Sequence, residues 1–182
     1  LFVLANAPIT VLSSYTLSVL PLFVLMGTVA VKGGLAEALY RAAYAFVGHR
    51  RGGLAIASIV ACGGFGSICG SSVATVSTLG RVSIPEMLRY GYSKQLAAGS
   101  LAAGGTLGIL IPPSVAMIIY AMVTQASLGR LFAAGIIPGI LATLLYCLAT
   151  SAWMRFNPSM GPAGEKTPWP ERWRTLRGVW GV

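Results

Sequence analysis

The sequence contains few charged residues. Only 9% of its 182 residues are Asp, Glu, Lys or Arg, whereas a soluble domain usually has about 25%. Four long stretches carry no charge at all: residues 1–31, 52–80, 95–129 and 131–154. Because 55% of the residues are hydrophobic, the low charge excludes both an ordinary soluble globule and an intrinsically disordered chain. The composition therefore predicts a protein whose apolar stretches cross or enter a lipid bilayer.

Acidic residues, histidine and cysteine are scarce as well. The chain has four acidic residues, one histidine and three cysteines, and no two cysteines form a Cys-x-x-Cys pair. This excludes a zinc or disulfide framework. The apolar stretches contain no carboxylate, which argues against a carboxylate-based proton pump. Since no His, Asp/Glu or Cys cluster can form, we expect that the protein is not an enzyme.

The basic residues indicate topology rather than a nucleic-acid partner, although the formal net charge is +9. They are dispersed in short loops instead of gathered on one soluble face. If the loops at residues 32, 49–51 and 81–94 and the tail beyond Arg155 face the cytoplasm, Arg130 alone among the 13 Lys and Arg residues lies outside. Both ends of residues 52–80 are then cytoplasmic. That stretch is too short for two crossings of about 20 residues each, so we expect a re-entrant hairpin.

These patterns predict an all-α membrane protein in five segments. Residues 1–34 form a transmembrane helix and turn, 35–51 an interfacial amphipathic helix, and 52–94 the re-entrant hairpin. Residues 95–156 form a broken transmembrane helix and a second transmembrane helix, and 157–182 form a basic cytoplasmic loop. Within the hairpin, a Gly-rich turn at 63–72 is expected to separate half-helices at 54–62 and 73–84.

The helix at 35–48 is expected to have one apolar and one polar face. The apolar face could lie on the bilayer or pack against another subunit, and both possibilities remain open. The apolar face holds Leu35, Leu39, Ala42, Ala43 and Phe46, and the polar face holds Glu37, Tyr40, Arg41 and Tyr44.

Two breaks at membrane depth are the main functional signal. Pro112 and Pro113 lack an N–H, so the carbonyls of Gly108 and Ile109 are expected to have no helical partner. The turn at 66–72 exposes carbonyls at the end of one half-helix and N–H groups at the start of the next. Free carbonyls suit a sodium ion, and free N–H groups suit a substrate carboxylate. Glycine and proline also serve helix packing in membranes, which remains the alternative for each single residue.

Several short runs occur together in this sequence. They are PLFVLMG at 21–27, GGLA at 52–55, GSSVAT at 70–75, IPEM at 84–87 with GY at 91–92, GILIPPS at 108–114, and LFAAGIIPG at 131–139. In this order they resemble the large membrane (M) subunit of tripartite ATP-independent periplasmic (TRAP) transporters. Each run is unspecific by itself, but the set is specific.

The resemblance implies one half of an inverted-repeat, elevator-type transporter. Residues 1–34 would belong to its scaffold, and 157–182 would lead to a second half. It further implies sodium-coupled import of an organic acid, such as a C4-dicarboxylate or sugar acid, across the bacterial inner membrane. Sodium would be the co-transported ion. A periplasmic solute-binding protein and a small membrane subunit would be the partners in the lipid bilayer, and nucleic acid would not be one.

The resemblance also implies site residues. The sodium ion would be held mainly by backbone carbonyls of the hairpin tip and the broken helix: Ser67, Gly70, Ser71, Gly108, Pro112 and Pro113. The substrate would contact Ser72, Thr75 and Ser114. Two other interpretations remain: another two-repeat sodium:carboxylate symporter that works without a binding protein, and a membrane scaffold subunit whose small residues are packing faces.

Overall fold

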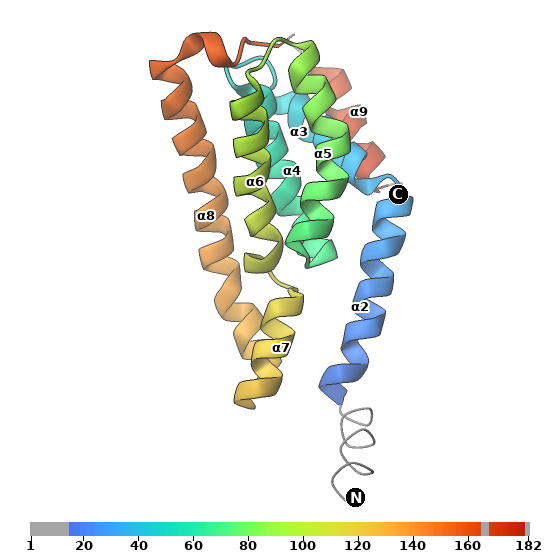
Figure 1. The fold of residues 1–182 in the computed structure, drawn as a ribbon. Helices are drawn as coiled ribbons and strands as arrows, with labels where there is room; N and C mark the ends of the chain where they lie inside the picture. The colour runs from blue at the N-terminus through green and yellow to red at the C-terminus, as the bar shows by residue number, and fades with distance from the viewer. Residues whose placement is uncertain (1–14, 165–167, 181–182) are drawn as a thin grey trace, which may run out of the picture.

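The computed structural model describes residues 15–164 and 168–180, and this part of the chain is helical throughout, without strands (Figure 1). The prediction of an all-α membrane protein is therefore confirmed. The helices are α2 (Tyr15–Lys32), α3 (Leu35–Val47), α4 (Gly53–Cys69), α5 (Ser72–Arg89), α6 (Lys94–Leu110), α7 (Val115–Thr124), α8 (Leu128–Phe156), the 3₁₀ turn η1 (Pro158–Met160) and α9 (Trp169–Trp180).

Two helical segments are long and apolar enough to cross a membrane. They are Lys94–Thr124, which joins α6 and α7, and Leu128–Phe156, which is α8. A third candidate is the pair α2 and α3, which bend by 61° relative to each other. The part of the predicted transmembrane segment at 1–34 that precedes Tyr15 lies outside the described residues.

Helices α4 and α5 form the expected hairpin. Both the start of α4 and the end of α5 lie at the end of the molecule where α6 begins and α8 finishes (Figure 1). The hairpin tip reaches only the depth of the break between α6 and α7, because the N–H of Val115 donates to the Gly70 carbonyl at 3.2 Å. Helix α7 continues beyond that level, so the hairpin spans only part of the length of the bundle and both of its ends lie at the same end.

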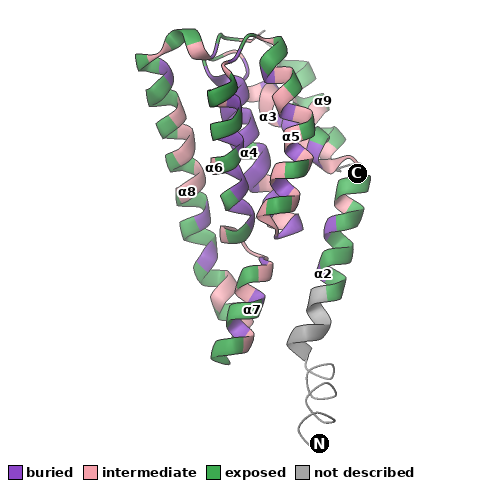
Figure 2. Ribbon diagram, viewed as in Figure 1, coloured by how far each residue is buried: buried purple, intermediate pink, exposed green. Residues whose placement is uncertain are grey.

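Helix α4 is the core of the described part. Leu54, Ile59 and Phe65 on this helix are buried almost completely, and Figure 2 shows α4 buried between its neighbours. It packs against α3, α5, α6 and α8 and also contacts α2. A helix that is apolar on all sides belongs in such a position.

The predicted Gly-rich break at 63–72 is largely wrong. Helix α4 runs through Gly63, Gly64 and Gly66 without interruption and ends only at Cys69. A Cβ on Gly66 would lie 2.6 Å from the Cα of Gly108, so glycine lets α4 and α6 approach closely. This packing outweighs the low intrinsic helix propensity of glycine. Helix α5 also extends beyond the expected residue 84, to Arg89.

Helix α3 occurs where it was predicted, but two residues of its polar face are misassigned: Tyr40, and Tyr44, which is partly buried and packs against the core. Tyr40 is only 4% exposed and belongs to the same buried cluster as Ala36 and Phe65. Helices α4 and α5 cover that side of α3, and the ring of tyrosine is apolar enough to be packed there. Glu37 and Arg41 do lie on the exposed side, where they form an ion pair.

The expected loop at 157–182 contains helical structure. After η1, helix α9 packs against α3. The guanidinium carbon of Arg172 lies 6.0 Å from the ring centre of Phe46 and 5.2 Å from that of Trp169. The contact with Phe46 joins α9 to α3, whereas Trp169 belongs to α9 itself; the Phe46 contact favours a helix docked on α3 over a free basic loop.

Candidate functional site at the hairpin tip

The hairpin turns at Gly70 and Ser71. Gly70 ends α4 with a left-handed φ of 60°, and its N–H donates to the Gly66 carbonyl at 2.7 Å. Ser71 is extended and caps α5, since its hydroxyl accepts a 3.4 Å hydrogen bond from the N–H of Ala74. A side chain at Gly70 would overlap the Phe23 ring and would approach the Pro113 carbonyl oxygen to 2.9 Å. Glycine is thus required here both by conformation and by space.

The second break lies between α6 and α7. Helix α6 ends at Leu110, Ile111 and Ser114 are extended, and the peptide bond between Pro112 and Pro113 is cis. The Ile109 carbonyl has no helical partner, as predicted, but it is not free, because the Ser114 hydroxyl donates to it at 2.8 Å. The Gly108 carbonyl accepts no hydrogen bond within the described residues, because the residue four positions later is Pro112.

The two breaks meet. The N–H of Val115, just after the second break, donates to the Gly70 carbonyl in the hairpin turn. Gly108 also lies against the start of α5, since a Cβ on it would be 2.9 Å from the Thr75 hydroxyl oxygen and 3.1 Å from the Ser71 carbonyl oxygen. The structure therefore brings five predicted residues together: Gly70, Ser71 and Thr75 of the hairpin with Gly108 and Pro113 of the broken helix. The Thr75 hydroxyl also donates to the Ser71 carbonyl at 2.7 Å.

Three predicted residues lie apart from this group. The Ser67 hydroxyl donates back along α4 to the Gly64 carbonyl at 2.7 Å. Pro112 faces α8, where a Cβ on Gly135 would lie 3.0 Å from its ring. Ser114 is completely buried with its hydroxyl proton engaged by Ile109, which leaves it poorly placed for contact with a substrate.

A cavity of about 520 Å³ adjoins the hairpin tip. It is lined by the first residues of α5 and of α7 and by one face of α2: Val24, Gly27, Thr28, Val31, Cys69, Gly70, Ser71, Ser72, Ala74, Ile109, Val115, Ala116 and Ile119. Ser72 was predicted as a substrate residue, and it does line the cavity. Thr75 was also predicted as one, but it is buried beside Gly108 instead.

The N-termini of two helices point to this cavity. Within the described residues the N–H groups of Ser72 and Ala116, in the first turns of α5 and α7, form no hydrogen bond. Free N–H groups at a helix N-terminus carry partial positive charge and favour an anion. The contribution of Ala116 and of the α2 residues was missed. In the sequence, only the position of Ala116 directly after the second break pointed to its place at the cavity. Nothing in the sequence indicated that α2 would form a wall of the cavity.

The chemistry of the site is that of neutral oxygen and N–H groups. No charged side chain lines the cavity, and no cluster of three His, Cys, Asp or Glu residues exists in the described part of the chain. Carbonyl and hydroxyl oxygens suit a hard cation such as sodium and not a soft transition metal. The arrangement can hold a small hard cation beside the breaks and an anion at the two helix starts.

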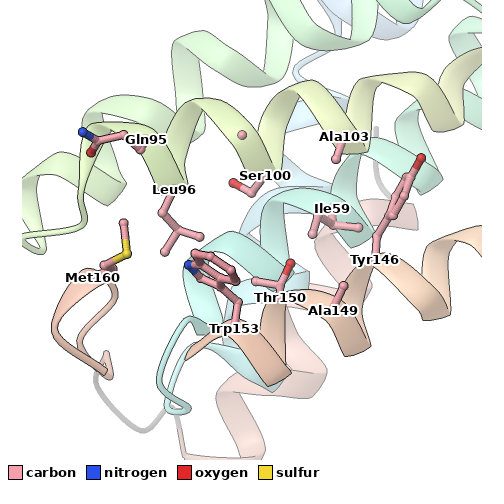
Figure 3. Close-up of a pocket in the computed structure, with 11 residues that line it drawn as sticks. Ile59, Gln95, Leu96, Ser100, Ala103, Tyr146, Ala149, Thr150, Trp153 and Met160 are labelled. Atoms are coloured by element: carbon pink, nitrogen blue, oxygen red, sulfur yellow. The ribbon is translucent and has the colours of Figure 1, made fainter. Parts of the chain in front are cut away.

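A second cavity, of about 400 Å³, lies between α6 and α8 (Figure 3). Its lining is mostly apolar, with Gln95, Ser100, Tyr146 and Thr150 as the main polar side chains. None of the predicted site residues contributes to it.

Comparison with known proteins agrees with this picture. Residues 1–181 match the family described as "Tripartite ATP-independent periplasmic transporter, DctM component". The chain is 50% identical, over 74% of its length, to the C4-dicarboxylate TRAP transporter large permease protein DctM of Vibrio cholerae, and covers 30% of that protein. It is 36% identical over its whole length to the protein of that name from Rhodobacter capsulatus, and covers 46% of it. It is also 38% identical over 73% of its length to the sialic acid TRAP transporter permease protein SiaT of Haemophilus influenzae. The chain thus spans less than half of these curated relatives.

Proposed function

Because the chain belongs to the DctM family of tripartite ATP-independent periplasmic transporter components, we propose that it forms part of a large permease subunit that imports an organic acid together with sodium across the bacterial inner membrane. The relatives are named as permeases and not as enzymes, in agreement with the sequence. Membership of this family favours the TRAP interpretation over a symporter without a binding protein and over a scaffold subunit. The remaining length of the permease supplies the second half of the transport path.

The observation that carries the proposal is the meeting of two helix breaks beside one cavity. The cavity lies at the starts of α5 and α7, where the N–H groups of Ser72 and Ala116 are free to bind an anion. A substrate carboxylate in this position replaces water around both N–H groups without requiring a buried arginine or lysine. The Ser72 hydroxyl adds a further donor.

Sodium binds on the other side of the tip, between the hairpin and the broken helix. Its ligands are the Gly108 carbonyl, which has no other partner in the described residues, the Thr75 hydroxyl oxygen and the Pro113 carbonyl. The C-terminal ends of α4 and α6 approach each other here, and their partial negative charge favours a cation. We therefore assign Thr75 to the sodium site rather than to the substrate site.

The hairpin and the helices behind it move relative to α2 during transport. Helix α2 reaches the tip through Phe23 and Gly27 and forms one wall of the cavity. Displacement of the tip along α2 would open the cavity to one side of the membrane and then to the other. A solute-binding protein delivers the acid and a small membrane subunit completes the complex, as the tripartite family implies.

Uptake by the reconstituted complete transporter tests the coupling. We expect uptake of a C4-dicarboxylate such as succinate, delivered by the binding protein, to require external sodium and to cease when potassium replaces it. If succinate is not transported, sialic acid and ectoine, which appear in the names of relatives, are tested in the same way. Uptake of any of these compounds that is unchanged without sodium would contradict sodium coupling.

A disulfide tests the movement. A Cβ on Gly27 would lie 3.4 Å from the Sγ of Cys69, close enough for a cysteine pair. In a permease without Cys62 and Cys147, the cysteine introduced by Gly27→Cys should form a disulfide with Cys69 on oxidation. Uptake should then stop, and it should recover when the disulfide is reduced. Gly27→Cys combined with Cys69→Ser is the control and should be insensitive to oxidation. A cross-linked permease that still transports would contradict movement of the tip past α2.

A further inference from the structure

Three arginines from distant parts of the sequence share one cavity. Arg50 and Arg51 follow α3, and Arg155 lies in the last turn of α8. Together with Ile56, Ser151 and Met154 they line a cavity of about 360 Å³. It lies at the end of the bundle where α4 begins and α8 finishes, remote from the hairpin tip (Figure 1).

The backbone around these arginines is fixed. The N–H of Gly52 donates to the Gly161 carbonyl at 2.9 Å, and the N–H of Gly164 donates to the Gly48 carbonyl at 2.9 Å. A side chain at Gly52, whose φ is 74°, would overlap that of Met154. The loop before α4 and the segment after α8 are thus held together, and this brings Arg155 to Arg50 and Arg51.

Within the part of the chain that the structure describes, the three positive charges have no acidic partner. In residues 15–164 and 168–180 an ion pair joins Glu37 and Arg41, whereas Arg50, Arg51 and Arg155 form none. Like charges placed together repel one another unless an anion binds between them. Guanidinium groups bind phosphate through two parallel hydrogen bonds, and the Ser151 hydroxyl can donate a further one.

The surroundings favour a phosphate that belongs to a lipid. The cavity wall includes the apolar side chains of Ile56 and Met154, and α8 exposes Leu148 (64%) and Phe156 (81%) near this end. At the same level of α8, Trp153 (55%) faces the second cavity, on the α6 side. Aromatic side chains of this kind collect where the bilayer meets water. A lipid bound here would place its headgroup among the arginines and its acyl chains along α8.

We propose that this arginine cavity binds the headgroup of an anionic phospholipid. The distribution of basic residues puts it on the cytoplasmic side, where basic pockets next to transmembrane helices recognise such lipids. The bound lipid holds the α4 and α8 ends of the hairpin-bearing part at the bilayer surface. This role is independent of the transported substrate and of sodium coupling.

Lipid binding to the purified complete permease in neutral detergent tests this inference. The probes are phosphatidylglycerol and phosphatidylcholine with the same acyl chains, and native mass spectrometry counts bound lipid. We expect phosphatidylglycerol to bind more tightly, and the triple variant Arg50→Gln, Arg51→Gln, Arg155→Gln to bind it about tenfold more weakly or worse. The matched control is Arg81→Gln, Arg89→Gln, Lys94→Gln, which removes equal charge from exposed positions outside the cavity and should bind almost as the wild type does.

The outcomes are distinct. Equal losses in both triple variants would show a diffuse charge effect, and equal binding of both lipids by the wild type would show no headgroup recognition. Displacement of phosphatidylglycerol by inorganic phosphate would show a free-anion site. Each of these results overturns the proposal. If the triple variant does not fold, Arg155→Gln alone, at an exposed position, should weaken phosphatidylglycerol binding severalfold, and unchanged binding would overturn it.

Discussion

Gly66 and Gly70 stand one helical turn apart in the hairpin, yet only Gly70 ends a helix. Gly66 is helical and lies against the backbone of Gly108, where a Cβ would come within 2.6 Å of the Cα. Gly70 has a φ of 60° and reverses the chain. One glycine permits two helices to touch and the other permits the chain to turn, although both lie in the same apolar run.

The broken helix repeats this contrast with different residues. Gly104 and Gly105 stay helical and pack against Cys62 and Val76, respectively, of the hairpin. The break follows at Ile111, where Pro112 and Pro113 remove two N–H donors. A glycine-rich stretch in this molecule therefore marks close packing of the hairpin with α6, whereas the site lies where the backbone hydrogen bonds are interrupted.

The largest expected effect concerns the turn. Gly70→Val puts a β-branched residue into the left-handed region and into the Phe23 ring, which should cost about 2–5 kcal/mol of stability. We expect uptake to be lost and the unfolding temperature of the purified permease to fall. A variant with wild-type uptake would show that the tip does not need this conformation.

The next effect concerns close packing and has a control two residues away. Gly66→Ala must push α4 from α6 and should cost about 1–3 kcal/mol, whereas a Cβ on Gly64 would meet Leu39 at an ordinary 3.5 Å. We expect Gly64→Ala to unfold at the wild-type temperature and Gly66→Ala well below it. Equal unfolding temperatures would contradict the distinction between the two glycines.

A smaller effect is expected at Ser114. Ser114→Ala removes the donor to the Ile109 carbonyl and should lower stability by about 1 kcal/mol. Because the hydroxyl does not line the cavity, the KM for the transported acid should remain unchanged. A rise in KM without loss of thermal stability would restore Ser114 to the substrate site.

Much of the fold follows from charge and apolar length. The helical hairpin of α4 and α5 was expected because basic residues flank a stretch too short for two crossings, and the candidate spans at α6–α7 and α8 follow from their lack of charge. The continuation of α4 through the glycine-rich stretch could not be predicted in this way, because the proximity of Gly108 to Gly66 depends on how α6 packs on α4. Tyr40 and α9 were missed for the same reason, since each is stabilised by a neighbouring helix.

The site was partly predictable. Missing N–H donors at Pro112 and Pro113 mark the second break from sequence alone. The separation of Thr75 from Ser72 could not be predicted, because only the packing of α5 on α6 directs Thr75 to Gly108 and leaves Ser72 at the cavity. The Ile109 carbonyl was expected to be free, but the side chain of Ser114 folds back onto it.

The sodium dependence of uptake by Thr75→Val tests the central claim most directly. Valine keeps the shape of threonine and removes the oxygen beside Gly108. The claim that the meeting point of the two breaks binds sodium predicts that the half-saturating sodium concentration rises about tenfold, as loss of one ligand worth about 1.4 kcal/mol requires. The KM for the acid at saturating sodium should stay near the wild-type value. An unchanged sodium dependence in a variant that folds and transports would contradict the claim.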